Sequence, residues 1–162
     1  MTERVLLDRD VQTPEAMHEI GLALAAVLAA GDLVVLTGPL GAGKTTLSRG
    51  IGEGLAVVGT VSSPTFVIAR THKRQSGGAE LVHVDAYRLT NTDEFDDLDI
   101  DLAKSITLVE WGRPFVSDLA TSWLDIEIDR DHTGATEIRH IVIMGFGPRW
   151  DGVELDARAH HA

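Results

Sequence analysis

The chain has 162 residues, no cysteine and a formal charge of −11, from 14 lysine and arginine residues against 25 aspartate and glutamate residues. This length fits one domain, and we expect residues 1–155 to form it and residues 156–162 to be a disordered tail. The lack of cysteine excludes thiol nucleophiles, iron–sulfur clusters and cysteine-type zinc sites. The negative charge argues against direct binding of nucleic acid, because a phosphate backbone would repel the chain.

The hydropathy of the chain gives no sign of a membrane segment. Its longest apolar stretch, residues 20–30, is too short to cross a bilayer, and no basic segment precedes it as in a signal peptide. We therefore expect a cytoplasmic protein that does not contact a membrane.

The first element predicted in the chain is an amphipathic helix over residues 13–31. Thr13 suits its N-cap, and Gly31 suits a left-handed end. Apolar residues recur at spacings of three and four, which places them on one face: Met17, Ile20, Leu24, Val27 and Leu28. The apolar run at residues 33–36 has no polar alternation, so it predicts a strand covered on both faces.

The rest of the chain predicts a second helix and several further strands. The second helix follows residues 38–46 and carries Leu47, Ile51 and Leu55 on one side. Apolar or alternating runs joined by turn residues predict two hairpins, one of residues 66–71 with 81–86 and one of residues 123–129 with 136–144. Residues 106–109 predict a buried strand, and residues 92–104 predict one or two short helical turns. The sum is an α/β fold, a three-layer P-loop NTPase-like domain whose mixed sheet has a parallel centre and antiparallel edge hairpins.

The segment Gly38-Pro-Leu-Gly-Ala-Gly-Lys-Thr45 matches the phosphate-binding motif G-x-x-x-x-G-K-[ST] at every fixed position. Such a loop turns tightly at its glycines, so that its amides and the following helix N-terminus surround a phosphate. Lys44 would bind the β- and γ-phosphates, and the Thr45 hydroxyl would bind Mg²⁺. We expect the nucleotide contacts of this segment to come from these residues: Gly38, Leu40, Gly41, Ala42, Gly43, Lys44, Thr45 and Thr46.

A phosphate loop also needs a carboxylate near the metal ion, at the end of a neighbouring strand. Glu110 ends the apolar run 106–109, and Asp85 ends the run 81–84 on the same strand face as His83. The alternative for Glu110 is a solvated strand end, and for Asp85 it is a turn cap or an ion pair with Arg88. His83 itself fits either a buried core histidine or a base.

Two further segments bear on the nucleotide. The hydroxyl-rich segment 62–66 follows the second helix, where Thr65 could contact metal or phosphate, although many loops have this composition. Residues 131–134 fit the D-x-x-G pattern of GTPases, but they occupy a hairpin turn and we interpret them as turn residues. No N-K-x-D motif is present, which argues against GTP.

Four motifs in this order and spacing make the sequence similar to the TsaE (YjeE) family, the ATPase subunit of the bacterial machinery that attaches threonylcarbamoyl to adenosine in tRNA. They span most of residues 13–144: Gly38-Pro-Leu-Gly-Ala-Gly-Lys-Thr-Thr-Leu-Ser-Arg-Gly50, Ser63-Pro-Thr-Phe66, His83-Val-Asp-Ala-Tyr-Arg-Leu89 and Glu110-Trp111. The first motif occurs in many nucleotidases, whereas the combination is specific to this family.

The resemblance implies ATP and Mg²⁺ as cofactors and a hydrolysis that depends on the partners TsaB and TsaD, with tRNA reached only through them. It implies that Glu110 holds Mg²⁺ with Thr45, that Asp85 belongs to the hydrolytic centre and that residues 63–66 act as a switch. It also places Trp111 beside this centre and Thr13 near the base of the nucleotide. Lys44, Asp85 and Glu110 are therefore the expected catalytic residues.

Some features of the sequence depart from the family or stay open. Pro39 and Arg113 stand at positions where the family often has acidic residues. Any role that acids at these two positions have in positioning water or contacting partners is therefore in doubt for this chain. An arginine finger is not assigned, because Arg70, Arg88, Arg113 and a partner's arginine all fit. Two other functions remain: a small-molecule kinase, which should carry an arginine-rich lid, and a nucleotide-sensing docking module without required hydrolysis.

Overall fold

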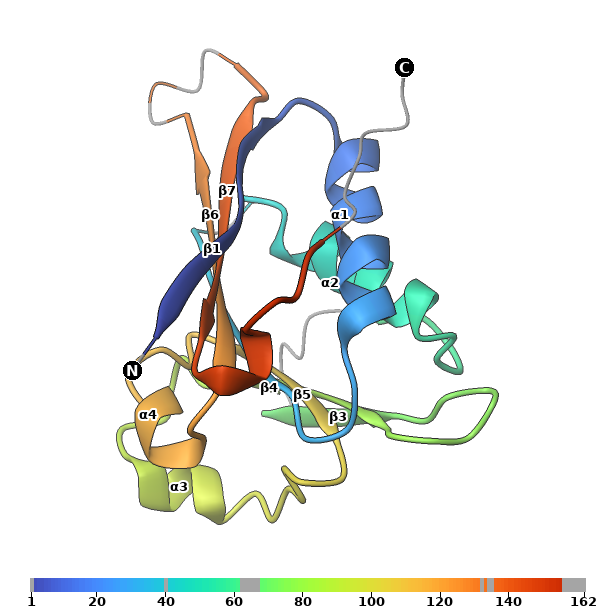
Figure 1. Ribbon diagram of the computed structural model, residues 1–162, viewed down its shortest axis with the longest axis vertical. Coiled ribbons are helices and arrows are strands. Elements are labelled where there is room, and N and C mark those ends of the chain that lie inside the picture. Colours follow the sequence, from blue (N-terminus) through green and yellow to red (C-terminus); the bar gives the residue numbers. More distant parts are fainter. Residues whose placement is uncertain (1, 40, 62–67, 132, 134–135, 156–162) are drawn as a thin grey trace.

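Figure 1 shows the computed structural model, which describes residues 2–39, 41–61, 68–131, 133 and 136–155. The predicted tail, residues 156–162, lies outside them. The elements in chain order are β1 (Glu3–Val11), α1 (Pro14–Val27), β2 (Leu33–Thr37), α2 (Lys44–Gly54), β3 (Ala69–His72), β4 (Leu81–Asp85), α3 (Thr92–Asp96), β5 (Ile106–Glu110), α4 (Val116–Leu119), β6 (Trp123–Arg130), β7 (Arg139–Phe146) and the 3-10 helix η1 (Pro148–Trp150).

The described strands form one sheet of seven, in the order β1-β7-β6-β2-β5-β4-β3. Strands β6, β2, β5 and β4 run parallel at its centre. The β1–β7, β7–β6 and β3–β4 pairs are antiparallel. The predicted mixed sheet with a parallel centre and antiparallel edges is therefore confirmed. Since parallel strands end at one edge, the carboxyl ends of β2, β4, β5 and β6 meet where α/β proteins bind ligands.

Helices cover this sheet on both faces. The long helices α1 and α2 lie together on one face, and the short helices α3 and α4 lie together away from them (Figure 1). Strand β2 feeds both layers: Val34 and Leu36 pack in the core with α1 and α2, whereas Leu33 and Val35 pack with Phe95 of α3 and its neighbours. The prediction that β2 is covered on both faces is confirmed.

Glycines allow α1 and α2 to touch backbone to backbone. A Cβ atom on Gly21 of α1 would lie 2.5 Å from the carbonyl oxygen of Leu47, and one on Gly50 of α2 would lie 2.3 Å from that of His18. Any larger side chain would push the helices apart. This close contact fixes the start of α2, and with it the loop that enters α2, against α1.

The structure differs from the sequence-based prediction at several element ends. Helix α1 ends at Val27 rather than Gly31, because Leu28 is already extended, and Gly31 has its left-handed φ of +93° in the turn into β2 instead. Strand β7 begins at Arg139, three residues later than expected. No helix in the described residues is long and apolar enough to cross a membrane.

Strand β1 was not predicted at all. It pairs with β7 at the edge of the sheet and has a register shift between Val5 and Leu7. Only Leu7 and Val11 of β1 are buried, while Val5 is 54% exposed. Its charged, half-exposed sequence gives no clean alternation of apolar and polar residues, so local pattern does not reveal it.

Candidate functional site

The glycine-rich segment forms a loop between β2 and α2, as its motif predicts. Gly41 and Gly43 have left-handed φ values of +79° and +113°, which L side chains rarely adopt. Ala42 is fully buried, and a Cβ atom on Gly38 would lie 2.7 Å from the carbonyl oxygen of Ile128 on β6. The backbone conformation of the loop therefore depends on its glycines.

Helix α2 begins without a capping side chain. Its N-cap is Gly43, which has no side chain to offer, so no side-chain cap hydrogen bond is formed. The other helices of five or more residues close this end themselves: Thr13 accepts from the Ala16 amide at α1, and Asn91 accepts from the Glu94 amide at α3. The first turn of α2 thus presents amides and a positive helix end to a ligand, as an anion site requires.

A buried carboxylate lies beside the first residue of α2. Glu110, at the end of β5, is only 6% exposed. One of its oxygens, Oε1, lies 3.7 Å from Nζ of Lys44, and the other, Oε2, lies 2.7 Å from Nε2 of His83 on β4. The alternative of a solvated strand end for Glu110 is wrong. The three side chains instead form a buried row from β4 through β5 to the loop.

The carboxyl group of Glu110 stays ionised more readily than an isolated one. Burial alone would raise its pKa, but the hydrogen bond and charge of His83 together with the ammonium group of Lys44 outweigh burial and lower the pKa. A carboxylate held ionised next to a lysine suits a cation-binding role, because cations coordinate the charged form.

The fit of this site to Mg²⁺ rests on a small number of protein oxygens. The described residues contain no group of three or more histidine, aspartate or glutamate side chains that could hold a metal ion by themselves. Magnesium in phosphate-loop proteins uses few protein ligands and takes the others from phosphate and water. Thr45, in the first turn of α2, and the buried Glu110 supply the hydroxyl and the carboxylate that such a site needs.

The ring of Trp111 lies against Lys44, and Tyr87 packs against that ring. Trp111 follows Glu110 with a left-handed φ of +62°, which is uncommon for a bulky residue and is held by a hydrogen bond from its amide to the Leu36 carbonyl. The Nζ atom of Lys44 lies 4.4 Å from the centre of the Trp111 ring, and Tyr87 meets that ring edge-on at 5.6 Å. Strained backbone of this kind is typical of binding sites.

A family model described as "Threonylcarbamoyl adenosine biosynthesis protein TsaE" matches residues 11–140 of this chain. The chain belongs to the TsaE family. The Streptomyces coelicolor protein named tRNA threonylcarbamoyladenosine biosynthesis protein TsaE is 52% identical over 147 residues, which cover 88% of this chain and 99% of the relative. The Bacillus subtilis protein of the same name is 36% identical over 141 residues and covers 85% of each chain.

A solved structure has the same fold. The crystal structure of Bacillus subtilis YdiB superposes with a TM-score of 0.70 and 29% sequence identity, over 93% of this chain and 92% of that chain. The resemblance drawn from the sequence motifs is therefore confirmed, and so is the predicted α/β fold of the P-loop NTPase type. Members of the TsaE family serve in the biosynthesis of threonylcarbamoyladenosine in tRNA.

In this TsaE family member, the structure gathers most of the expected site residues at one edge of the sheet. Gly38, Gly41, Ala42, Gly43, Lys44, Thr45 and Thr46 form the loop and the first turn of α2. Glu110 and Trp111 lie next to Lys44. Leu40, Thr65 and the proposed switch segment 63–66 lie outside the described residues.

Two expected contacts have a structural role in the molecule as it stands. Asp85 pairs with Glu110 in the register of β4 and β5, and its Oδ1 accepts a hydrogen bond from the Tyr87 amide, so it caps the turn after β4. Thr13 caps α1 one turn before Met17, whose Cε would lie 3.2 Å from a Cβ atom on Gly43. Thr13 thus begins the helix that borders the loop, while its contact with the base and the catalytic role of Asp85 remain predictions.

Sequence reasoning missed two arginines of the β6–β7 hairpin. Nη2 of Arg139 donates a hydrogen bond of 3.1 Å to the carbonyl of Gly41, and a Cβ atom on Gly41 would lie 3.0 Å from Nη1 of Arg130. Both residues stand far from the motif in sequence. The signal that could have found them is the parallel pairing of β6 with β2, which brings the end of β6 to the edge where the loop begins.

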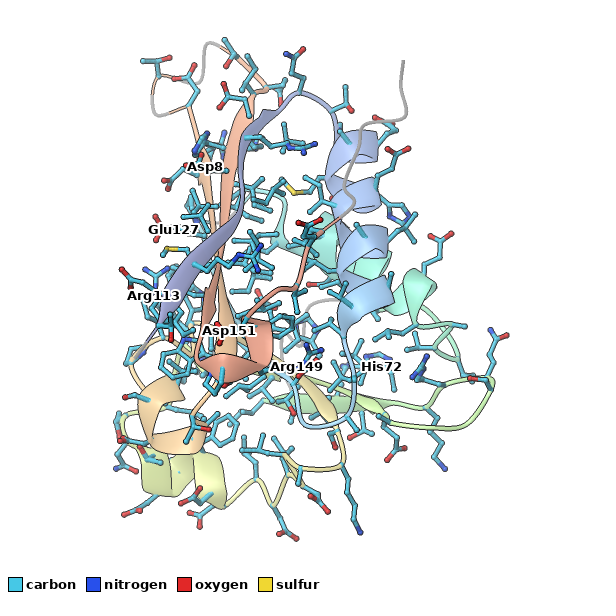
Figure 2. The ribbon with its side chains drawn as sticks, viewed as in Figure 1. Asp8, His72, Arg113, Glu127, Arg149 and Asp151 are labelled. Atoms are coloured by element: carbon cyan, nitrogen blue, oxygen red, sulfur yellow. The ribbon has the colours of Figure 1, made fainter. Side chains whose placement is uncertain are left out.

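An open pocket of about 650 Å³ is lined in part by Trp111. Its lining includes Thr37 at the end of β2 and the side chains of Tyr87, Phe115 and Arg113. Arg113 is held there by bonds of 2.6 to 2.9 Å to Asp125 and Glu127 of β6; Figure 2 shows the labelled Arg113 and Glu127 side by side at the sheet. These three hydrogen bonds hold Arg113 against β6, which argues against Arg113 as an arginine finger.

Proposed function

We propose that this protein is a Mg²⁺-dependent ATPase that works with partner proteins of the TsaB and TsaD type in the threonylcarbamoylation of adenosine in tRNA. The observation that carries the proposal is the buried row of Lys44, Glu110 and His83 beside an uncapped helix start, in a chain of the TsaE family. Family membership supports the pathway, and the loop geometry supports the nucleotide.

The residues of this chain divide the work of hydrolysis. Amides of the loop and of the first turn of α2 bind the phosphates, and Lys44 offsets the charge on the β- and γ-phosphates. Thr45 and Glu110 would hold Mg²⁺, which would supply further positive charge at the phosphates. Either Asp85 or Glu110 orients the attacking water. Trp111 packs against Lys44 and Tyr87 packs against the Trp111 ring, so the two rings border the site where it meets the open pocket.

The rate of hydrolysis should depend on the partners. Arg139 donates to the Gly41 carbonyl, Arg130 lies next to the Cα side of Gly41, and Arg113 is tied to β6. We therefore expect slow turnover alone and a clear increase when TsaB and TsaD are added. An isolated protein that already hydrolyses ATP at about 10 per second or faster would contradict the proposal.

A small-molecule kinase is the second function with a specific observation in its favour. The open pocket beside Trp111 is large enough for a metabolite that accepts a phosphoryl group. Incubation with γ-labelled ATP and a metabolite extract separates the two functions. The ATPase releases labelled inorganic phosphate, whereas a kinase transfers the label to an organic acceptor.

Glu110→Ala tests whether hydrolysis is needed at all. In the ATPase proposal this variant loses hydrolysis and fails to support tRNA modification in a reconstituted system with the partner proteins. A nucleotide-sensing module would instead keep its affinity for ATP and support full modification. The parent protein and Lys44→Ala serve as the positive and negative controls in the same assay.

A further inference from the structure

His83 occupies a place in the core that hydrophobic residues usually fill. Its side chain is fully buried on β4, between the apolar Val82 and Val84. Its Nε2 atom lies 2.7 Å from Oε2 of Glu110, whereas its Nδ1 atom is buried without a hydrogen-bond partner among the described residues. A buried polar ring with only one bond costs free energy, so the bond that it does make needs an explanation.

The two ring nitrogens of His83 differ in what surrounds them. A proton on Nδ1 would be a buried donor with no acceptor, whereas a proton on Nε2 is donated to the carboxylate of Glu110. An N–H at Nε2 that donates to Glu110 is therefore the arrangement that leaves the bond to Glu110 intact. The Nδ1 atom lies in the protein interior, away from solvent. Of the two roles open to His83 from the sequence, its complete burial supports the buried core histidine.

The bond from His83 decides where the carboxylate of Glu110 points. His83, Asp85 and Glu110 lie on one face of the sheet, because Asp85 pairs with Glu110 in parallel register and His83 is two residues earlier. With Oε2 held at His83, the second oxygen, Oε1, lies 3.7 Å from Lys44, which is too far for a direct hydrogen bond. Without that bond, the flexible glutamate side chain is free to close on the lysine.

We propose that His83 is a positioning residue, which holds Glu110 at ion-pair distance from Lys44 rather than in a direct hydrogen bond, so that one carboxylate oxygen stays available to a divalent cation. This inference rests on the proposed function, since it deepens the role of Glu110 at the same site. Outer groups that orient a metal ligand in this way typically change metal affinity by 10-fold or more when they are removed. His83 acts through Glu110 and does not touch the nucleotide.

Two substitutions of similar size separate the hydrogen bond from the packing. His83→Gln places an amide N–H near the position of Nε2, whereas His83→Met fills the same space without a donor. Calorimetric titration with ATP is carried out for both variants and the parent, once with Mg²⁺ and once with EDTA. His83→Met should lose about 10-fold of the affinity gain that Mg²⁺ provides and change its metal-free ATP affinity by less than about 2-fold. His83→Gln should keep most of the gain.

Folding and hydrolysis complete the test. Urea unfolding of each variant shows how much of any loss is structural, and the Mg²⁺ concentration for half-maximal hydrolysis should rise about 10-fold in His83→Met alone. If His83→Met does not fold, His83→Asn replaces it, because its shorter side chain keeps a polar amide that does not reach Oε2.

The outcomes divide cleanly. The positioning role is overturned if Mg²⁺ raises the ATP affinity of His83→Met as much as it does for the parent. It is also overturned if all variants lose the same part of this increase and their lower stability accounts for the loss. If the parent protein binds no ATP in either condition, the proposed function itself fails. If the parent binds ATP with a Mg²⁺ gain that no variant alters, only the role of His83 fails.

Discussion

Two buried carboxylates mark opposite ends of the parallel centre of the sheet, and their surroundings differ. Asp32, just before β2, accepts three hydrogen bonds from two residues: from the Ala29 amide at 2.8 Å, and from Nε and Nη2 of Arg149 at 2.9 and 3.0 Å. Glu110, at the end of β5, has one hydrogen bond to His83 and a longer contact of 3.7 Å to Lys44.

The difference lies in how completely each carboxylate is bonded. Arg149 also donates to the Val27 carbonyl and stacks on Trp150, so the cluster at Asp32 joins α1, β2 and the segment after β7. Every charge there has its partners inside the protein. Glu110 and Lys44 keep bonding capacity for something else. The saturated cluster therefore serves folding, and the unsaturated one serves binding.

Arg149→Met should produce the largest effect, and it should fall on stability. Methionine can still cover Trp150, but Asp32 is left as a buried carboxylate with only the Ala29 amide. We expect the free energy of unfolding to fall by about 3 kcal/mol, at the low end for a broken buried ion pair because the Arg149 side chain is 35% exposed. Urea unfolding measures this change. A loss below about 1 kcal/mol would mean that the cluster behaves like a surface ion pair, and an altered ATP affinity in the folded variant would contradict the division of roles.

Lys44→Ala should show the opposite profile. Removal of the ammonium group should weaken ATP binding by about 100-fold, or about 2.7 kcal/mol, and abolish hydrolysis. The free energy of unfolding should change by less than about 1 kcal/mol, because the contact with Glu110 is long. Calorimetry and urea unfolding on the same preparation test both statements. A variant as unstable as Arg149→Met would show that the two clusters do not differ in kind.

The two clusters also differ in how far the sequence predicts them. Lys44 and Glu110 follow from a phosphate-loop motif and from an acid at the end of an apolar run, because the chemistry fixes local spacing. The Arg149–Asp32 pair joins residues separated by 117 positions, and no local pattern carries it. The burial of Glu110 and its bond to His83 likewise depend on the register of β4 with β5, which the sequence does not state.

The same distinction holds for the fold. Buried central strands such as β2 and β5 have continuous apolar runs, so their sequences predict them well. The edge strand β1 is held by pairing with β7, and its own sequence is half-exposed and largely charged. The sequence predicts the end of α1 too late, at Gly31, because Gly31 looks like a C-cap. The helix ends at Val27, and the hydrogen bond from the Ala29 amide to Asp32 shapes the turn that follows.

Arg139→Gln should have a smaller effect, confined to the loop. It removes the bond of 3.1 Å to the Gly41 carbonyl, which ties the loop to β7. A loop that is less ordered before binding loses more conformational entropy when it binds, and this cost lowers the affinity. We expect ATP affinity to fall by about 3- to 5-fold, with unfolding changed by less than about 0.5 kcal/mol. An unchanged affinity in Arg139→Gln would show that the loop needs no support from the hairpin.

His140 provides the smallest expected effect and separates bonding from burial. Its two ring nitrogens each lie 2.7 Å from a carboxylate, Asp10 at Nδ1 and Asp8 at Nε2, yet its side chain is 45% exposed. The hydrogen bond to Asp10, with help from Asp8, raises the pKa of His140 above its usual value. The protonated ring is thus favoured in the folded state, so its contribution to stability is present below about pH 6.5 and is lost as the pH rises through the raised pKa.

The comparison of the parent with His140→Gln isolates this contribution from the other histidines. The parent should have the higher melting temperature at about pH 6. The difference should shrink towards about pH 9, because only the parent has the His140 proton to lose over this range. Its size should stay below about 1 kcal/mol and fall further in 0.5 M salt, since water and ions screen an exposed cluster. A difference that grows with pH would reverse the sign of the linkage. A large, salt-independent difference would show that complete bonding alone, without burial, makes a cluster structural.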